Sequence, residues 1–248
     1  RVIAKRRSSG APFSVFLRPA WETPCIDTMM LLLPSHQSPT IDVKPHMPIA
    51  RAQEILKHQF GYDEFRMNQQ AAVECVLARK DCLVLMPTGG GKSLCYQIPA
   101  LMQDGLTVVV SPLIALMKDQ VDALRLNGVK AAFLNSSQES SVQQEVIASI
   151  RSGDVRILYI APERLLQSSG QFIDFLRSLR VSLFAIDEAH CISSWGHDFR
   201  PEYTQLGRLK SWFPEVPVIA LTATADRLVR QDILEKLHIE HAEVFASS

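Results

Sequence analysis

MPTGGGKS at residues 86–93 decides the fold class of this 248-residue chain. It follows the apolar run CLVLM at 82–86 and precedes the helical stretch LCYQIPALM. A glycine-rich turn between a buried strand and a helix offers backbone amides and the positive end of the helix dipole to phosphate oxygens. We predict a phosphate-binding loop in which Lys92 reaches the β and γ phosphates of ATP and the Ser93 hydroxyl binds Mg2+. The other loop members are Thr88, Gly89, Gly90 and Gly91.

A plain glycine-rich turn is the alternative interpretation of this stretch. It leaves Lys92 and Ser93 unexplained, because a turn does not require them. The strict phosphate-loop pattern has glycine where this chain has Met86, so the loop is a variant.

DEAH at 187–190 follows a second apolar run, SLFAI at 182–186. The pattern predicts that Asp187 holds Mg2+ through its water shell and that Glu188 orients and deprotonates the attacking water. An acidic helix cap is the alternative for such a pair. His190 has no second His or Cys at zinc-ligand spacing, so we expect it to hydrogen-bond or couple, and we expect no zinc in the chain.

Apolar runs alternate with amphipathic segments from residue 47 onward, which predicts an α/β fold. Such runs are typical of parallel strands covered by helices on both faces, so we expect a mostly parallel sheet whose carboxyl edge holds the ligand. The expected strands are 82–86, 107–110, 131–134, 157–160, 182–186 and 218–221. Helical stripes expected in the core are Leu113, Met117, Val121 and Leu124; Val142, Val146 and Ile150; and Val229, Ile233 and Leu237.

Composition excludes several classes of protein. The 26 basic and 26 acidic residues balance, so any nucleic-acid binding must come from local placement. Five scattered cysteines argue against a secreted disulfide framework and favour a reducing cytosol. No apolar stretch reaches the roughly 18 residues of a membrane span. The proline-rich, basic segment 1–46 is expected to be a poorly ordered extension to a domain at 47–248.

With LTATA at 221–225 added, these motifs resemble the superfamily 2 helicases, whose motor has two RecA-like domains with ATP between them. FGYDEFRMNQ at 60–69 resembles the adenine-reading motif of the RecQ family. The resemblance implies that Gln69 bonds the adenine edge and that Tyr62 and Arg66 pack near the base. A lone glutamine at a helix start is otherwise usually solvated.

CISSWGHDFRPEY at 191–203 resembles the aromatic-rich loop that distinguishes RecQ from DEAH RNA helicases. Trp195 and Phe199 offer faces on which single-stranded bases stack, while His197, Asp198 and Arg200 offer polar links toward the ATP site. The alternative is that both aromatic residues pack in the core.

Weaker matches suggest contacts with the DNA backbone and a coupling motif. Ser111, Lys118 and Arg164 resemble the family's phosphate contacts, although each is also an ordinary surface residue. Thr222 and Thr224 resemble the threonines whose hydroxyls bridge toward the DEAH carboxylates.

The RecQ resemblance covers about residues 49–248 and implies a 3′ to 5′ DNA helicase of recombination and repair. It departs at Ser194, where many relatives are expected to have Gln, and after Ser248, where a second motor domain with an arginine finger, a zinc-binding region and a winged helix are expected. The implied ligands are ATP and Mg2+, and the partner is single-stranded or partially duplex DNA. The protein is expected to be monomeric, cytoplasmic and associated with the nucleoid.

Residues 1–248 alone are expected to bind ATP and DNA weakly and not to unwind. Two alternatives stay open. One is a non-enzymatic, truncated form that binds DNA or competes with the full motor. The other is an unrelated phosphate-loop ATPase such as a transporter subunit, which leaves 191–203 unexplained.

Overall fold

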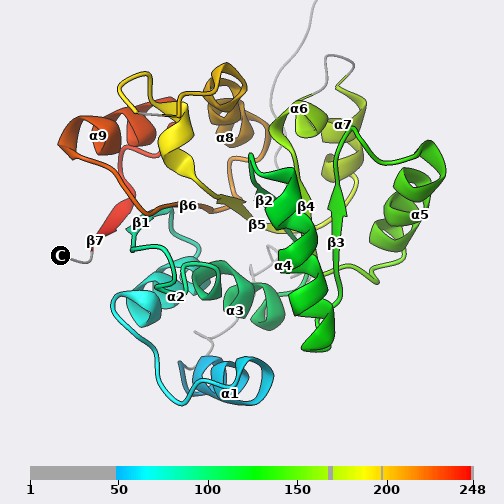
Figure 1. The fold of residues 1–248 in the computed structure, drawn as a ribbon, viewed down its shortest axis with the longest axis horizontal. Coiled ribbons are helices and arrows are strands. Elements are labelled where there is room, and N and C mark those ends of the chain that lie inside the picture. The colour runs from blue at the N-terminus through cyan, green and yellow to red at the C-terminus, as the bar shows by residue number, and fades with distance from the viewer. Residues whose placement is uncertain (1–48, 167–169, 197, 247–248) are drawn as a thin grey trace, which may run out of the picture. The chain divides into compact units, whose positions relative to one another are not determined.

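A seven-stranded parallel sheet forms the centre of the computed structural model (Figure 1). The structure describes residues 49–166, 170–196 and 198–246; the expected extension at 1–46 lies outside them. The strand order is β3-β4-β2-β5-β6-β1-β7. The strands are β1 (Cys82–Leu85), β2 (Leu106–Val110), β3 (Ala131–Leu134), β4 (Ile157–Ile160), β5 (Val181–Ile186), β6 (Val218–Thr222) and β7 (Glu243–Ala246).

Helices cover both faces of the sheet because side chains alternate along each buried strand. On β5, Leu183 and Ala185 pack toward α2 and α3, whereas Phe184 and Ile186 pack toward α7 and α9. Figure 1 shows α2 and α3 below the sheet and α8 and α9 above it. The helices are α1 (Ile49–Phe60), α2 (Gln69–Leu77), α3 (Leu94–Met102), α4 (Ile114–Leu126), α5 (Ser140–Arg151), α6 (Pro162–Leu165), α7 (Gln171–Arg177), α8 (Arg208–Trp212) and α9 (Arg227–Lys236), with 3-10 helices η1 (Ala189–Ile192) and η2 (Pro201–Gly207).

The predicted α/β class and the six predicted strands are confirmed, and every strand pairing in the described sheet is parallel. Two details differ. The sequence analysis missed β7, whose residues are mostly exposed at the sheet edge and form no long apolar run. In the α5 stripe Ile150 is buried, but Val142, in the first turn of the helix, is 40% exposed.

Strand order brings the three motifs together. Strand β6 pairs with β5 on one side and β1 on the other, so residues following β6 lie between the glycine loop and DEAH. At this edge the Met86 amide donates to the Thr222 carbonyl (3.2 Å), and the Asp187 amide donates to the Val110 carbonyl (2.9 Å). The carboxyl ends of parallel strands are where ligands of open α/β sheets bind.

None of the described helices is both long enough and apolar enough to span a lipid bilayer.

Candidate functional site

The glycine loop connects β1 to α3 and depends on backbone conformations that favour glycine. Gly89 and Gly91 have φ values of 78° and 76°, in the left-handed region. At Gly90 a Cβ atom would lie 2.9 Å from the Pro87 carbonyl oxygen. Lys92 folds over the loop, and its Nζ donates to the Met86 carbonyl (3.2 Å). The loop therefore presents its amides and the Lys92 ammonium together at the start of α3.

Gln69 is tied to this loop and is 2% exposed, so the solvated alternative is excluded. Its Nε2 donates to the carbonyls of Gly90 and Gly91, both at 3.1 Å, and its Oε1 accepts from the Arg66 amide (2.8 Å). A side chain on Gly91 would collide with Gln69 Nε2. The amide that is predicted to bind adenine is therefore also hydrogen-bonded to the phosphate loop.

Tyr62 and Arg66 lie beside the same loop, and their contact with the base stays a prediction. The Arg66 guanidinium lies 5.6 Å from the centroid of the Tyr62 ring, a cation–π distance. A small open pocket joins these residues to the glycines. Its lining adds Glu64 and Leu94. Glu64 lies within the 60–69 motif and Leu94 directly follows the glycine loop, but neither residue type by itself indicates a ligand contact.

The Asp187 carboxyl group lies where β5 ends, and although the residue keeps partial exposure, this group is largely shielded. Burial first, and the nearby Glu188 carboxylate second, raise the pKa of Asp187 to about 6. The Glu188 amide donates to Asp187 Oδ1 (3.0 Å), and Lys92 lowers the same pKa by its charge. A shielded carboxylate beside the phosphate loop suits a divalent cation, which would compensate its charge. Ser93 and Asp187 are the residues that would hold Mg2+.

Glu188 has φ 48° and ψ 45°, a left-handed conformation that is uncommon for a side chain other than glycine. This turn directs the chain from β5 into η1 and places Glu188 Oε2 3.3 Å from His190 Nδ1. Strain of this kind is found at functional sites more than elsewhere.

His190 connects DEAH to the segment after β6. Its Nδ1 lies 2.9 Å from Thr222 Oγ1, and the Thr222 hydroxyl donates to the Thr224 carbonyl (3.0 Å). Because that hydroxyl uses its proton on Thr224, we assign the proton of the imidazole to Nδ1, from which it is donated to Thr222. The Thr222 side chain is therefore linked to DEAH by its hydrogen bond with His190, and Thr224 contributes its backbone carbonyl to the same network.

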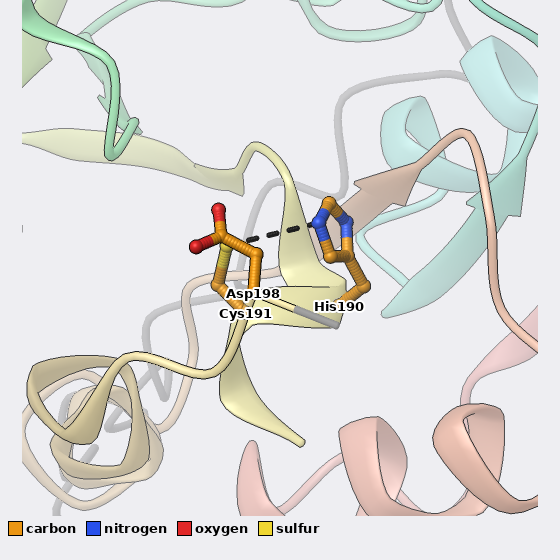
Figure 2. A group of neighbouring side chains, drawn as sticks. All are labelled: His190, Cys191 and Asp198. Carbon is orange, nitrogen blue, oxygen red and sulfur yellow. Dashed lines mark hydrogen bonds between the residues drawn. The ribbon is translucent and has the colours of Figure 1, made fainter. Parts of the chain in front are cut away.

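His190, Cys191 and Asp198 form a group whose potential ligand atoms all lie within 4.8 Å of one another (Figure 2). The fold brings this group together from two adjacent residues and a loop, so ligand spacing along the sequence does not reveal it. Two observations disfavour a cation here. Arg200 pairs with Asp198 (3.3 Å), and burial first, with the Asp198 charge second, raises the pKa of the Cys191 thiol to about 12. We infer that these three residues hold DEAH and the following loop together. The absence of zinc stays a prediction.

The aromatic loop, residues 191–200, exposes the side chains predicted to stack on bases. Trp195 is 74% exposed and Phe199 is 42% exposed, so the alternative that both pack in the core is wrong. Arg200 donates to Asp198 (3.3 Å) and to the Pro112 carbonyl (3.2 Å), which links the loop to the end of β2. His197 lies outside the described residues.

The weaker DNA-backbone candidates have local partners. Ser111 is buried at the end of β2, and Lys118 pairs with Asp122 on α4 (2.7 Å). Arg164 Nε donates to Gln143 Oε1 (3.3 Å), and its guanidinium lies 5.1 Å from the Phe172 ring centroid. Their contacts with DNA stay predictions.

Comparison with known proteins gives a consistent result. The family described as "DEAD/DEAH box helicase" matches residues 66–232. The chain is 54% identical over 197 residues to the ATP-dependent DNA helicase RecQ of Pasteurella multocida, covering 79% of this chain and 31% of that protein. It is 52% identical over 192 residues to the ATP-dependent DNA helicase RecQ of Bacillus subtilis, covering 77% and 32%. The chain thus spans about a third of the length of these relatives.

Solved structures agree in fold. The DUF1998 helicase MrfA bound to DNA and AMPPNP superposes with a TM-score of 0.63 at 21% identity, over 82% of this chain and 30% of that one. The Pyrococcus furiosus Hef helicase domain gives a TM-score of 0.56 at 21% identity, over 73% of this chain and 38% of that one.

Proposed function

The chain belongs to the DEAD/DEAH box helicase family, and we propose that residues 47–248 form the first, ATP-binding RecA-like domain of a RecQ-like DNA helicase. The observation that carries the proposal is the meeting of three features at one sheet edge. The glycine loop with Lys92, the Asp187 and Glu188 carboxylates, and the exposed aromatic loop all follow strands that are neighbours or near neighbours in the sheet.

The nucleotide site is proposed to work through the residues already placed. The amides of the glycine loop would cradle the phosphates, and Lys92 Nζ would exchange the Met86 carbonyl for a phosphate oxygen. Ser93 and Asp187 would hold Mg2+, which supplies charge compensation at the phosphates. Glu188, held beside His190, would orient the attacking water and accept its proton.

Adenine recognition is proposed to involve a change at Gln69. Its Nε2 is engaged by two loop carbonyls, so bidentate pairing with adenine requires the amide to leave at least one of them. Binding of the base would then remove a hydrogen bond between Gln69 and the phosphate loop. Tyr62 and Arg66 would flank the base from the side of the shared pocket.

DNA coupling is proposed to run from the aromatic loop to the ATP site. Bases would stack on Trp195 and Phe199, and Asp198 and Arg200 would transmit the loop's position. His190 connects the start of this loop to Thr222, next to the phosphate loop. Ser111, Lys118 and Arg164 are proposed to contact DNA phosphates at the same sheet edge.

The resemblance to RecQ supports a 3′ to 5′ polarity, single-stranded and partially duplex DNA as partner, a monomeric state, association with the nucleoid, and roles in recombination and repair. It also implies that an arginine of a second RecA-like domain completes the ATP site. Such an arginine is worth about a thousandfold or more in rate. We therefore propose that residues 1–248 alone bind Mg-ATP, hydrolyse it slowly and do not unwind a duplex.

Titration of residues 1–248 with a fluorescent ATP analogue in Mg2+ tests the nucleotide site. Lys92→Ala should weaken binding by about tenfold or more, because a charge-assisted hydrogen bond to phosphate is lost. Lys130→Ala is the matched control, since Lys130 pairs with Asp154 on the surface and lies in none of the three motifs. Equal binding by the Lys92 variant, or duplex unwinding by residues 1–248, would contradict the proposal.

A further inference from the structure

Helix α9 is hydrogen-bonded at its start to the segment that follows β6. Asp226 caps the helix by accepting from the Val229 amide (2.8 Å). Arg230 Nε donates back to the Ala225 carbonyl (2.9 Å). Two hydrogen bonds thus join Ala225 and Asp226 to α9, three residues after Thr222, the last residue of β6, which contacts His190.

The other end of α9 holds the aromatic loop through Lys236. Lys236 Nζ donates to the Ile192 carbonyl (3.2 Å) and to Asp232 Oδ2 (2.9 Å). The same ammonium lies 5.8 Å from the Phe199 ring centroid. One side chain thus touches both the beginning and the end of the loop.

Asp232 completes the attachment. Its carboxylate pairs with Lys236, and hydrogen bonding from Ser193 and from the Ser194 backbone favours its charged form and so lowers its pKa. Burial pushes the pKa of Asp232 up, but these bonds and the Lys236 charge outweigh it and hold the pKa below its usual range. The Asp232 and Lys236 side chains are only 16% and 30% exposed, so solvent screens this pair less than an open surface pair.

We infer that Asp232 and Lys236 are positioning residues that set the conformation in which the aromatic loop meets DNA and link that loop to Thr222 at the ATP site. The inference rests on the proposed function and deepens it. Single-stranded DNA is the ligand, and its bases would stack on Trp195 and Phe199. The Phe199 ring also lies within cation–π distance of Lys236. Neither positioning residue belongs to a motif that the sequence analysis selected.

The experiment compares α9 variants of residues 1–248 by two binding measurements. Anisotropy of a labelled oligo(dT) gives the affinity for single-stranded DNA, and the fluorescent ATP analogue gives the affinity for Mg-nucleotide. Asp232→Ala and Lys236→Met remove the attachment, and Lys236→Arg keeps the positive charge. Gln231→Ala is the matched control, because it removes only the exposed Gln231–Glu235 pair on the same helix.

We expect Asp232→Ala and Lys236→Met to weaken DNA binding about fivefold, with nucleotide affinity within about twofold of wild type. Lys236→Arg and Gln231→Ala should bind DNA as wild type does. Hydrogen exchange should rise at 191–196 in the two disrupting variants and stay unchanged in β5, because only the loop loses its anchor.

Two results would overturn the inference: wild-type DNA affinity in both disrupting variants, or a parallel loss of DNA and nucleotide affinity, which indicates general destabilisation. If wild-type residues 1–248 fail to bind oligo(dT), the proposed function fails, and the inference falls with it. If wild type binds oligo(dT) but the α9 variants bind it equally well, the inference fails and the proposed function stands.

Discussion

Individual residues at the nucleotide site occupy positions that few other side chains could take. Gly91 combines a positive φ with the packed Gln69 amide, and Glu188 adopts a left-handed conformation although it is not glycine. Asp187 keeps a carboxyl group in a shielded place. Features of this kind are more frequent at functional sites than elsewhere, which fits the proposed nucleotide site.

Gly91→Ala should lose both stability and nucleotide affinity. The new methyl group meets Gln69 Nε2, and the positive φ adds about 1 kcal/mol of strain. Gly153→Ala is the control, because Gly153 has φ 80° with nothing within 4 Å of a Cβ. Thermal unfolding should show a loss in both variants, larger in Gly91→Ala, whereas nucleotide titration should change only in Gly91→Ala. Unchanged nucleotide affinity in that variant would count against the role of Gln69.

Asp187 predicts a pH dependence of stability in the absence of metal and nucleotide. Its folded pKa of about 6 lies above the ordinary 3.8, so the folded chain holds the proton more tightly than the unfolded chain. The stability contributed by this proton is present below about pH 4 and is lost as the pH rises to about 6. Asp187→Asn cannot ionise, so it should gain stability relative to wild type between these values.

Chemical denaturation of both proteins in EDTA at several pH values checks this prediction. A difference in unfolding free energy that does not change across the window would show that Asp187 is not shielded as the structure has it.

At the scale of elements, sequence periodicity predicted each buried strand to within about two residues, because these strands are apolar on both faces. Strand β7 was not predicted from the sequence, because it is mostly exposed and has no continuous apolar run. The contacts between α9 and the aromatic loop were not predicted either, for a different reason. Asp232 and Lys236 are ordinary polar residues on a helix, and only the fold brings them to the aromatic loop.

Asp81 joins several elements at the end of the sheet opposite the site. Its carboxylate accepts from the Val218 amide (2.7 Å) at the start of β6 and pairs with Lys210 of α8 (3.0 Å). Asp81→Ala leaves the partly buried amide and ammonium without this acceptor, so unfolding free energy should fall by about 2 kcal/mol. Nucleotide affinity should stay unchanged. Asp154→Ala, which removes an exposed pair with Lys130, should move the melting temperature little. Equal losses in the two variants would contradict the assignment.

At the scale of the molecule, the sequence predicted the phosphate loop, DEAH and the exposed aromatic loop as parts of one site. Their connections were not predictable from motifs. The bonds of Gln69 to the glycine loop and of His190 to Thr222 join residues that are 21, 22 and 32 positions apart. These bonds join the predicted adenine contact to the glycine loop and join DEAH to the end of β6.

Coupling between the aromatic loop and the nucleotide site can be measured as the affinity of residues 1–248 for labelled oligo(dT), with and without Mg-AMPPNP, in wild type and Trp195→Ala. We expect wild type to bind the oligonucleotide and the nucleotide to change this affinity, since coupling between two sites is reciprocal. Trp195→Ala should lose about tenfold in DNA affinity, because one stacking face is removed, and keep its nucleotide affinity. DNA binding that is equal in the two proteins and insensitive to nucleotide would contradict the account.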